Sequence, residues 1–166
     1  MLVIRSTYEM VLSLFAFYWK TSYLYLPKLS VMRKNILLID DDKIFNFLSE
    51  KTISSLGLAN EIHFASNGQQ ALDLLELSKT GEIQKPDIIF LDLNMPIMNG
   101  YEFFEAFLAM ELPDKHLITL VILTSSADPQ DLKRAKDLGI KYYFNKPLTQ
   151  EEIKKLIVQE FSLELN

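Results

Sequence analysis

The sequence predicts an α/β fold, a doubly wound (βα)5 arrangement in which helices cover both faces of a parallel five-stranded sheet. From Asn35 onward, short aliphatic runs alternate with segments whose apolar residues recur at helical spacing. The aliphatic runs are continuous, which is typical of strands that are buried on both faces. A chain of 166 residues has room for one such domain and a modest extension.

Five short runs are the predicted strands of this sheet. Each is bounded by residues that favour turns, as strands usually are. The polar residue that follows a run lies at the carboxyl end of that strand, where ligands bind in sheets of this kind. The predicted strands are Ile36–Ile39, Glu61–Ala65, Asp87–Leu91, Leu117–Leu123 and Tyr142–Phe144.

Helices are predicted between the strands and after the last one. Gly57 is expected to cap the first helix at its carboxyl end, because glycine adopts the left-handed conformation easily. A third helix is expected over Tyr101–Leu112, where the aromatic residues face the core. The fourth begins with Asp128 and Pro129, and Thr149 with Glu152 forms a capping box for the fifth.

Composition excludes several classes of function. A net charge of -5 and the lack of any Lys/Arg run argue against a nucleic-acid partner, which would need a concentrated basic surface. The chain has 0 cysteines, so disulfides, thiolate metal sites and a cysteine nucleophile are excluded. This composition fits a cytoplasmic protein. Any chemistry must come from oxygen and nitrogen groups.

The first 31 residues form an extension to the domain predicted for residues 32–166. Its apolar stretch, Met10–Trp19, is too short to span a bilayer comfortably and is not followed by a small-residue cleavage site, so a membrane location is not expected. We favour a mis-assigned start, because the sequence from Met32 looks like a natural beginning. A short apolar helix at a membrane surface or a partner is the alternative.

The residues that end the predicted strands form one group of charged and polar side chains. Asp40 and Asp41 follow the first strand, Asp92 the third, Thr124 the fourth and Lys146 the fifth. The carboxyl ends of parallel strands meet at one edge of a sheet, so these side chains should converge. Three carboxylates at close range repel one another unless a cation lies between them. Mg²⁺ prefers such oxygen ligands and leaves room for a phosphate.

One of the carboxylates is a candidate nucleophile. An aspartate that attacks phosphorus forms an acyl phosphate and divides a difficult transfer into two easier steps. Lys146 would neutralise one phosphoryl oxygen, and Thr124 could donate a hydrogen bond to another. Taken singly, the aspartates could be a helix start or a turn and Lys146 a surface charge. Their joint placement at strand ends favours the functional interpretation.

Four motifs carry a resemblance to a known family. They are "LLIDDDKI", "IIFLDLNMPIMNG", "VILTSS" and "YYFNKPLT". From Met32 to about Phe161 the chain resembles the receiver domains of bacterial response regulators, among which the chemotaxis regulator is a single-domain member. The resemblance implies a flavodoxin-like fold and a single-domain regulator of a phosphorelay, with no DNA-binding output domain.

The resemblance also implies a role for each motif residue. Asp92 would accept the phosphoryl group from a histidine kinase or a histidine phosphotransfer protein, and a downstream protein, not identified by the sequence, would respond. Mg²⁺ would be the cofactor. By the resemblance its ligands are Asp40, Asp41, Asp92 and the backbone carbonyl of Asn94. The resemblance also implies that Lys146 contacts the phosphate and that the Lys146–Pro147 bond is cis. Thr124 and Tyr143 would be the switch residues.

Two alternatives come from other functional classes. An aspartyl-phosphate enzyme of the haloacid dehalogenase type would need a second aspartate two residues after Asp92, where this chain has Asn94, which cannot transfer a proton. We therefore expect a signalling protein and not an enzyme. A binding module that works without phosphorylation would not need the complete set of acidic residues, threonine and lysine. For Tyr143, ordinary packing is the competing interpretation, and the adjacent Tyr142 is a competing candidate for the same role.

Overall fold

The computed structural model describes residues 33–126 and 128–161, so the predictions for the N-terminal extension lie outside the described residues. A 5-stranded sheet in the order β2-β1-β3-β4-β5 forms the centre of this part of the chain. All four neighbouring pairs of strands are parallel. The strands are β1 (Lys34–Ile39), β2 (Ala59–Ala65), β3 (Ile88–Leu91), β4 (Thr119–Thr124) and β5 (Tyr142–Asn145).

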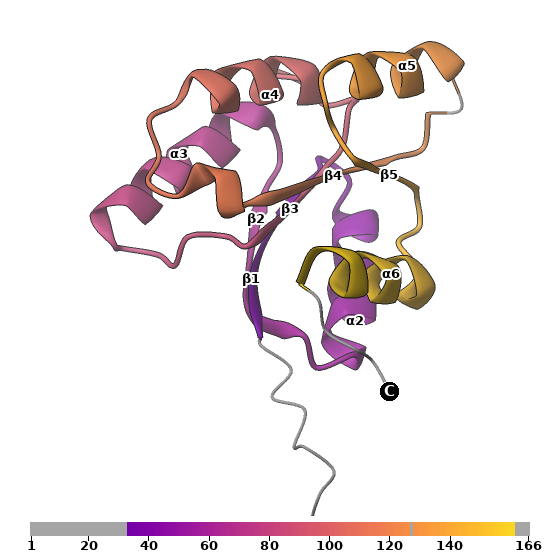
Figure 1. The fold of residues 1–166 in the computed structure, drawn as a ribbon, viewed down its shortest axis with the longest axis horizontal. Coiled ribbons are helices and arrows are strands. Elements are labelled where there is room, and N and C mark those ends of the chain that lie inside the picture. Colours follow the sequence, from indigo (N-terminus) through magenta and orange to yellow (C-terminus); the bar gives the residue numbers. More distant parts are fainter. Residues whose placement is uncertain (1–32, 127, 162–166) are drawn as a thin grey trace, which may run out of the picture. The chain divides into compact units, whose positions relative to one another are not determined.

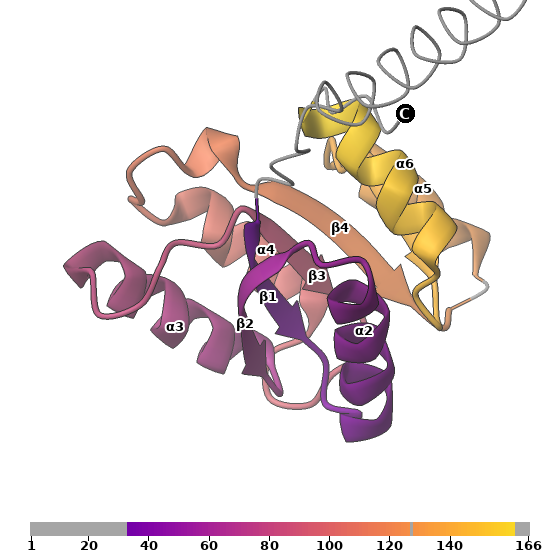
Figure 2. The ribbon, with the colours of Figure 1, turned by 90° about the horizontal axis from the view of Figure 1, so that it is seen from below.

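Helices lie on both faces of the sheet, as Figures 1 and 2 show. Helices α2 (Lys43–Ser55) and α6 (Gln150–Phe161) share one face. The other face carries α3 (Gly68–Thr80), α4 (Gly100–Ala109) and α5 (Pro129–Asp137). A short 3-10 helix, η1 (Lys115–Leu117), precedes β4.

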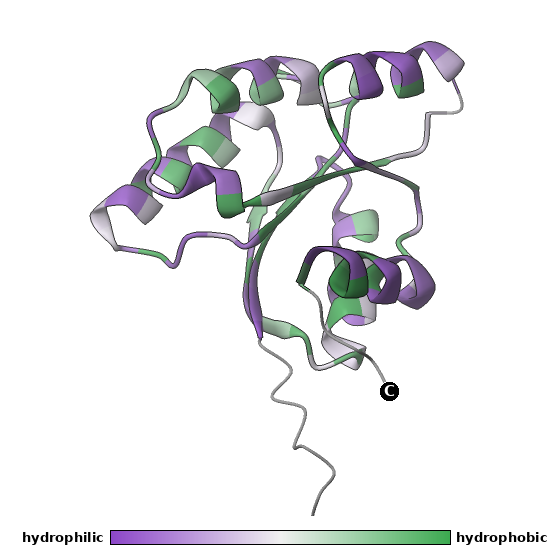
Figure 3. Cartoon of the chain, viewed as in Figure 1, coloured by the Kyte–Doolittle hydropathy of each residue, from purple (hydrophilic) through white to green (hydrophobic). Residues whose placement is uncertain are grey.

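The core follows from the apolar strands. Every residue of β3 is buried, because this strand has neighbours on both sides and helices on both faces. The aromatic residues Phe103, Phe104 and Phe107 of α4 are also buried, as predicted. Figure 3 shows the strands mostly in the hydrophobic colour and α5 mostly in the hydrophilic one. Along α5, only Ala135 is buried, so the basic residues of this helix form a solvated face.

Most of the predicted helix starts are confirmed. Asp128 accepts a hydrogen bond from the Gln130 amide and Pro129 occupies the first turn of α5. Thr149 and Glu152 make the reciprocal hydrogen bonds of a capping box before α6. Polar caps satisfy amide groups that have no partner within the helix. The capping box of α4, built by Asn99 and Glu102, was not predicted.

The predicted cap of α2 is confirmed, because Gly57 follows Leu56 in the left-handed conformation with φ 65. Several predicted boundaries are wrong by one to three residues. Helix α4 ends at Ala109 although Leu112 is buried, because that side chain packs from the following loop. Leu117 belongs to η1 and is exposed, so β4 begins at Thr119.

The predicted fold class is confirmed. In the strand order β2-β1-β3-β4-β5, the direction of winding reverses between β1 and β3. This is the flavodoxin-like, doubly wound arrangement, and its ligand site lies at the carboxyl ends of β1 and β3. Among the described helices, none is long and apolar enough to cross a membrane.

Candidate phospho-acceptor and metal site

The two aspartates that end β1 and β3 lie side by side at the switch point. Asp40 is 6% exposed and Asp92 is 5% exposed. The backbone holds both in register, because the Asp40 amide donates to the Ala65 carbonyl and the Asp92 amide donates to the Ile39 carbonyl. Two carboxyl groups are thus fixed at the predicted edge of the sheet.

Lys146 reaches these two carboxyl groups from the end of β5. Its Nζ lies 2.6 Å from Asp40 Oδ2 and 3.0 Å from Asp92 Oδ2, and its side chain is 4% exposed. The Lys146 amide donates to the Thr124 carbonyl, and the Lys146–Pro147 bond is cis as expected. The ring of Phe45 lies 4.9 Å from Nζ, so the ammonium is enclosed by carboxylates and an aromatic face.

The charges at this site do not balance. Burial raises the pKa of Asp40 above its ordinary value, although the hydrogen bond from Lys146 opposes that shift. Asp40, Asp41 and Asp92 each offer a carboxylate oxygen, and these atoms lie within 4.8 Å of one another. Three carboxylates face one ammonium, which leaves two negative charges. Hard oxygen donors with this excess charge fit a divalent cation such as Mg²⁺.

The third aspartate of the acidic run has a structural role. Asp42 is the N-cap of α2 and accepts hydrogen bonds from the amides of Ile44 and Phe45. Its own amide donates to Asp40 Oδ1 at 2.9 Å. Asp42 therefore orients Asp40 and positions the helix that begins beside the site.

The loop after β3 is shaped around Asp92. The Leu93 amide donates to Asp92 Oδ1 at 2.8 Å, which orients the carboxylate. Gly100, at the start of α4, leaves no room for a side chain, because a Cβ there would overlap the Asp92 carbonyl oxygen and lie 2.9 Å from Leu93 Cα. Asn94 is exposed in this loop, two residues after Asp92. The role of its backbone carbonyl as a metal ligand stays a prediction.

The two predicted switch residues lie on the neighbouring strands β4 and β5, where Thr124 ends β4 and Tyr143 is in register with Ile122. Thr124 is 0% exposed, and its Oγ1 accepts a hydrogen bond from the Ser126 amide at 3.2 Å. The Tyr143 ring packs against the core, and its hydroxyl is buried without a hydrogen-bond partner among the described residues. Burial raises the pKa of Tyr143, and the carboxylates of Asp131 and Asp128 raise it further.

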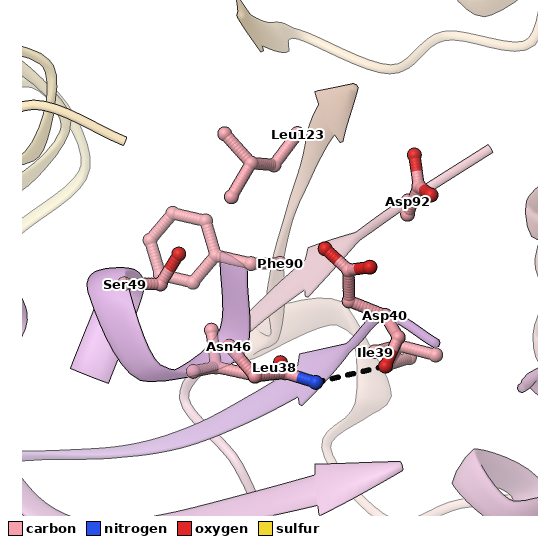
Figure 4. Close-up of a pocket in the computed structure, with 8 residues that line it drawn as sticks. All are labelled: Leu38, Ile39, Asp40, Asn46, Ser49, Phe90, Asp92 and Leu123. Carbon is pink, nitrogen blue, oxygen red and sulfur yellow. Dashed lines mark hydrogen bonds between the residues drawn. The ribbon is translucent and has the colours of Figure 1, made fainter. Parts of the chain in front are cut away.

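A small cavity lies beneath the two buried aspartates (Figure 4). Its volume is about 10 Å³, which is close to the space that one water molecule needs. Asn46 of α2 lines it and donates from Nδ2 to the Asp40 carbonyl at 2.8 Å. The sequence-based prediction missed Asn46 and the position of Phe45 under Lys146. Their place in the first turn of the helix after the acidic run is the signal that could have indicated both.

A flavodoxin-like sheet with an acidic cluster and a buried lysine at its switch point defines a class of signalling domain. The response regulator receiver domain family matches residues 36–158, and the chain belongs to this family. It is therefore homologous to the regulators of two-component systems and phosphorelays. The resemblance predicted from the four motifs is confirmed.

Individual relatives agree with this assignment. The chain is 31% identical over 133 residues to the probable methanogenesis regulatory protein FilR2 of Methanothrix harundinacea, a match that covers 79% of this chain and 84% of that protein. It is 33% identical to the crystal structure of a two component response regulator from Cytophaga hutchinsonii, with a TM-score of 0.68 over 78% of this chain and 97% of that one. The Mn(2+)-bound form of response regulator Rcp1 is 26% identical, with a TM-score of 0.61 over 80% of this chain and 96% of that one.

Proposed function

We propose that residues 32–166 form a receiver domain that accepts a phosphoryl group on Asp92 from a histidine kinase or a histidine phosphotransfer protein. The observation that carries the proposal is the position of Lys146 Nζ, within hydrogen-bond distance of both Asp40 and Asp92. In the transfer, the P–N bond of the phosphohistidine breaks as a P–O bond to an Asp92 carboxylate oxygen forms. Lys146 would neutralise the charge that the phosphoryl group brings.

The same proposal assigns the metal. Asp40, Asp41, Asp92 and the backbone carbonyl of Asn94 would hold Mg²⁺, and the oxygen atoms of the three carboxylates are close enough for a shared ion. When bound, the ion supplies positive charge that stabilises phosphoryl oxygens. The Mn(2+)-bound form of the similar response regulator Rcp1 supports the binding of a divalent cation by this chain. Lys146 and the Leu93 amide orient the Asp92 carboxylate.

The product of this reaction would be a signal. Thr124 and Tyr143 would respond to the new charge on Asp92 and alter the affinity for a downstream protein. Asn94 stands where an aspartyl-phosphate enzyme would need a proton donor, which supports a switch and not an enzyme with turnover. A net charge of -5 and the lack of cysteine support a cytoplasmic protein that binds no nucleic acid.

Incubation with acetyl phosphate and Mg²⁺ tests this function. We expect the intact mass to increase by one phosphoryl group in the wild-type protein and not in Asp92→Asn. The matched control is Asp73→Asn, because Asp73 is exposed on α3 and its carboxylate accepts a hydrogen bond from Gln69. This control should be modified like the wild type. A wild-type protein that gains no mass with any small donor would refute the proposal.

A further inference from the structure

A polar network outside the phospho-acceptor site joins α4 and α5 to the segment after β4. Its centre is Asp131, in the first turn of α5. Ser126 Oγ donates to Asp131 Oδ2 at 2.5 Å. Tyr101 Oη lies 3.0 Å from the Asp131 carbonyl oxygen and 3.3 Å from Asp131 Oδ1, and it can donate to either. One residue therefore holds the hydroxyl groups of two others that come from different elements.

The network reaches the switch threonine through Ser126. The Ser126 amide donates to Thr124 Oγ1, so the position of the threonine hydroxyl depends on where Ser126 is held. The Asp128 amide in turn donates to Ser126 Oγ at 3.2 Å. A displacement of the Thr124 hydroxyl toward Asp92 would break its bond with Ser126 and disturb the bond from Ser126 to Asp131.

The network reaches the phospho-acceptor loop through Tyr101. Tyr101 is 7% exposed and follows Gly100, which packs against the backbone of Asp92. Burial raises the pKa of Tyr101 to about 12, and the Asp131 carboxylate contributes to the shift, so the hydroxyl stays protonated and remains a donor. The guanidinium of Arg134 lies 3.9 Å from the centre of the Tyr101 ring and covers it.

Asp131 also acts on the second switch residue. After burial, its carboxylate is the largest influence that raises the pKa of Tyr143. The Tyr143 hydroxyl has no hydrogen-bond partner among the residues that the structure describes. The Asp131 carboxylate, the strongest acceptor of the network, is already engaged by Ser126 and Tyr101. The hydrogen bonds of Asp131 thus reach Thr124 through Ser126, while the charge of Asp131 disfavours ionisation of the Tyr143 hydroxyl.

We propose that Asp131 is a positioning residue for the phosphorylation switch, which holds Ser126 and Tyr101 together and so keeps the Thr124 hydroxyl in its unphosphorylated position. The inference rests on the proposed phosphorylation of Asp92. Coupling between two sites is reciprocal. If the network opposes the displacement of the Thr124 hydroxyl toward Asp92, weakening the network must favour that displacement. Removing one of its hydrogen bonds should therefore strengthen binding of a phosphoryl group at Asp92.

Beryllofluoride with Mg²⁺ serves as a non-covalent phosphoryl analogue for the test. Tyr101→Phe removes one hydroxyl and keeps the buried ring, and Asp131→Asn removes the charge. We expect both variants to bind beryllofluoride about three- to tenfold more tightly than the wild type. Asp137→Asn is the matched control, because Asp137 lies on the same helix and its side chain makes no hydrogen bond or ion pair within the described ranges. Its affinity should equal that of the wild type.

The result that overturns the proposal is an affinity that is unchanged or weaker in both variants, since a merely structural role would not increase it. A second measurement is independent of Asp92 chemistry. In the unmodified protein, NMR should show faster amide exchange at Ser126 in Tyr101→Phe and Asp131→Asn than in the control, and equal exchange would overturn the proposal. If the wild type binds no beryllofluoride, the proposed function fails, and amide exchange alone decides whether Asp131 positions this segment.

Discussion

The two ends of the sheet each contain a buried lysine, but their charges are balanced differently. At the amino end, Lys34 Nζ lies 3.9 Å from Asp87 Oδ1 and 3.8 Å from the centre of the Phe161 ring, so one ammonium faces one carboxylate. At the carboxyl end, Lys146 contacts Asp40 and Asp92, with Asp41 nearby.

An excess of buried negative charge lowers stability unless a cation compensates it. A protein keeps such an excess where its function requires it, so perturbed charges cluster at functional sites. The amino end has no such excess in the part of the chain that the structure describes. The comparison therefore separates two uses of buried lysine, one that supports the fold and one that supports chemistry.

The largest expected effect tests this separation directly. Replacing Lys146 with methionine should lower the initial rate of Asp92 phosphorylation by acetyl phosphate about 100-fold, because a charged donor at the transferred group is lost. The comparison variant is Lys34→Met, which removes the other buried ammonium and should keep the rate within about threefold of the wild type. Intact mass against time measures both rates. An equal loss in the two variants would show that the two ends do not differ in this way.

The second prediction concerns metal binding. Addition of Mg²⁺ at about 100 times its dissociation constant should stabilise the wild-type protein by about 2.7 kcal/mol, seen as an increase of several degrees in the thermal midpoint. Asp40→Asn should lose this increase. Without metal it should be more stable than the wild type, because burial disfavours the charged form of Asp40 and one ammonium then faces one buried carboxylate.

At the amino end, Asp87→Asn is the control for the metal experiment. It should show the full increase with Mg²⁺, since the Asp87 carboxylate accepts a hydrogen bond from the Asn35 amide and Asp87 lies at the other end of β3. Differential scanning calorimetry with EDTA and with Mg²⁺ measures all three proteins. A midpoint of the wild type that does not change with Mg²⁺ would contradict a metal site at Asp40 and Asp92.

The sequence predicted the convergence at the carboxyl end because strand ends are fixed by topology. Asp40 and Asp92 each follow a buried strand and Lys146 follows the half-buried strand β5, and parallel strands bring such positions together. The boundaries of the elements were harder to predict, because Leu117 is an apolar residue that suits a strand but lies in the 3-10 helix η1. Local sequence patterns do not show how the packing of neighbouring elements shifts the boundary of a strand.

The network around Asp131 could not be predicted for a different reason. Tyr101 and Asp131 lie on separate helices, 30 residues apart in sequence. No periodicity relates side chains on two helices, and their contact depends on how α4 and α5 pack on the sheet. Each of these residues taken singly has an ordinary structural explanation, as a core aromatic and as an acidic residue in a first helical turn. The structure supplies the connection between them.

A third prediction examines another lysine near the amino end. Lys115 Nζ donates to the carbonyl groups of Phe107, Leu108 and Met110, at 3.1, 2.6 and 2.7 Å, and so satisfies the end of α4. Lys115→Met should lower the free energy of unfolding by about 1–2 kcal/mol, because these carbonyls lose a charged donor. Urea denaturation measures the change. The rate of Asp92 phosphorylation should stay at the wild-type value, and a loss of rate would place Lys115 in the functional region.

The smallest expected effect compares the backbone at the two ends. Ile97, in the loop after Asp92, has φ 72 and is 84% exposed, whereas Asp114, before η1, has φ 53. A β-branched residue is strained in the left-handed region, and aspartate tolerates that region better. Ile97→Gly should therefore raise the free energy of unfolding by about 1 kcal/mol, and Asp114→Gly should change it by about 0.5 kcal/mol or less. Chemical denaturation of both variants measures the difference. Equal effects at both positions would show that the loop beside the phospho-acceptor holds no more strain than an ordinary turn, while a larger effect at Ile97 would show that stability is reduced locally beside the site.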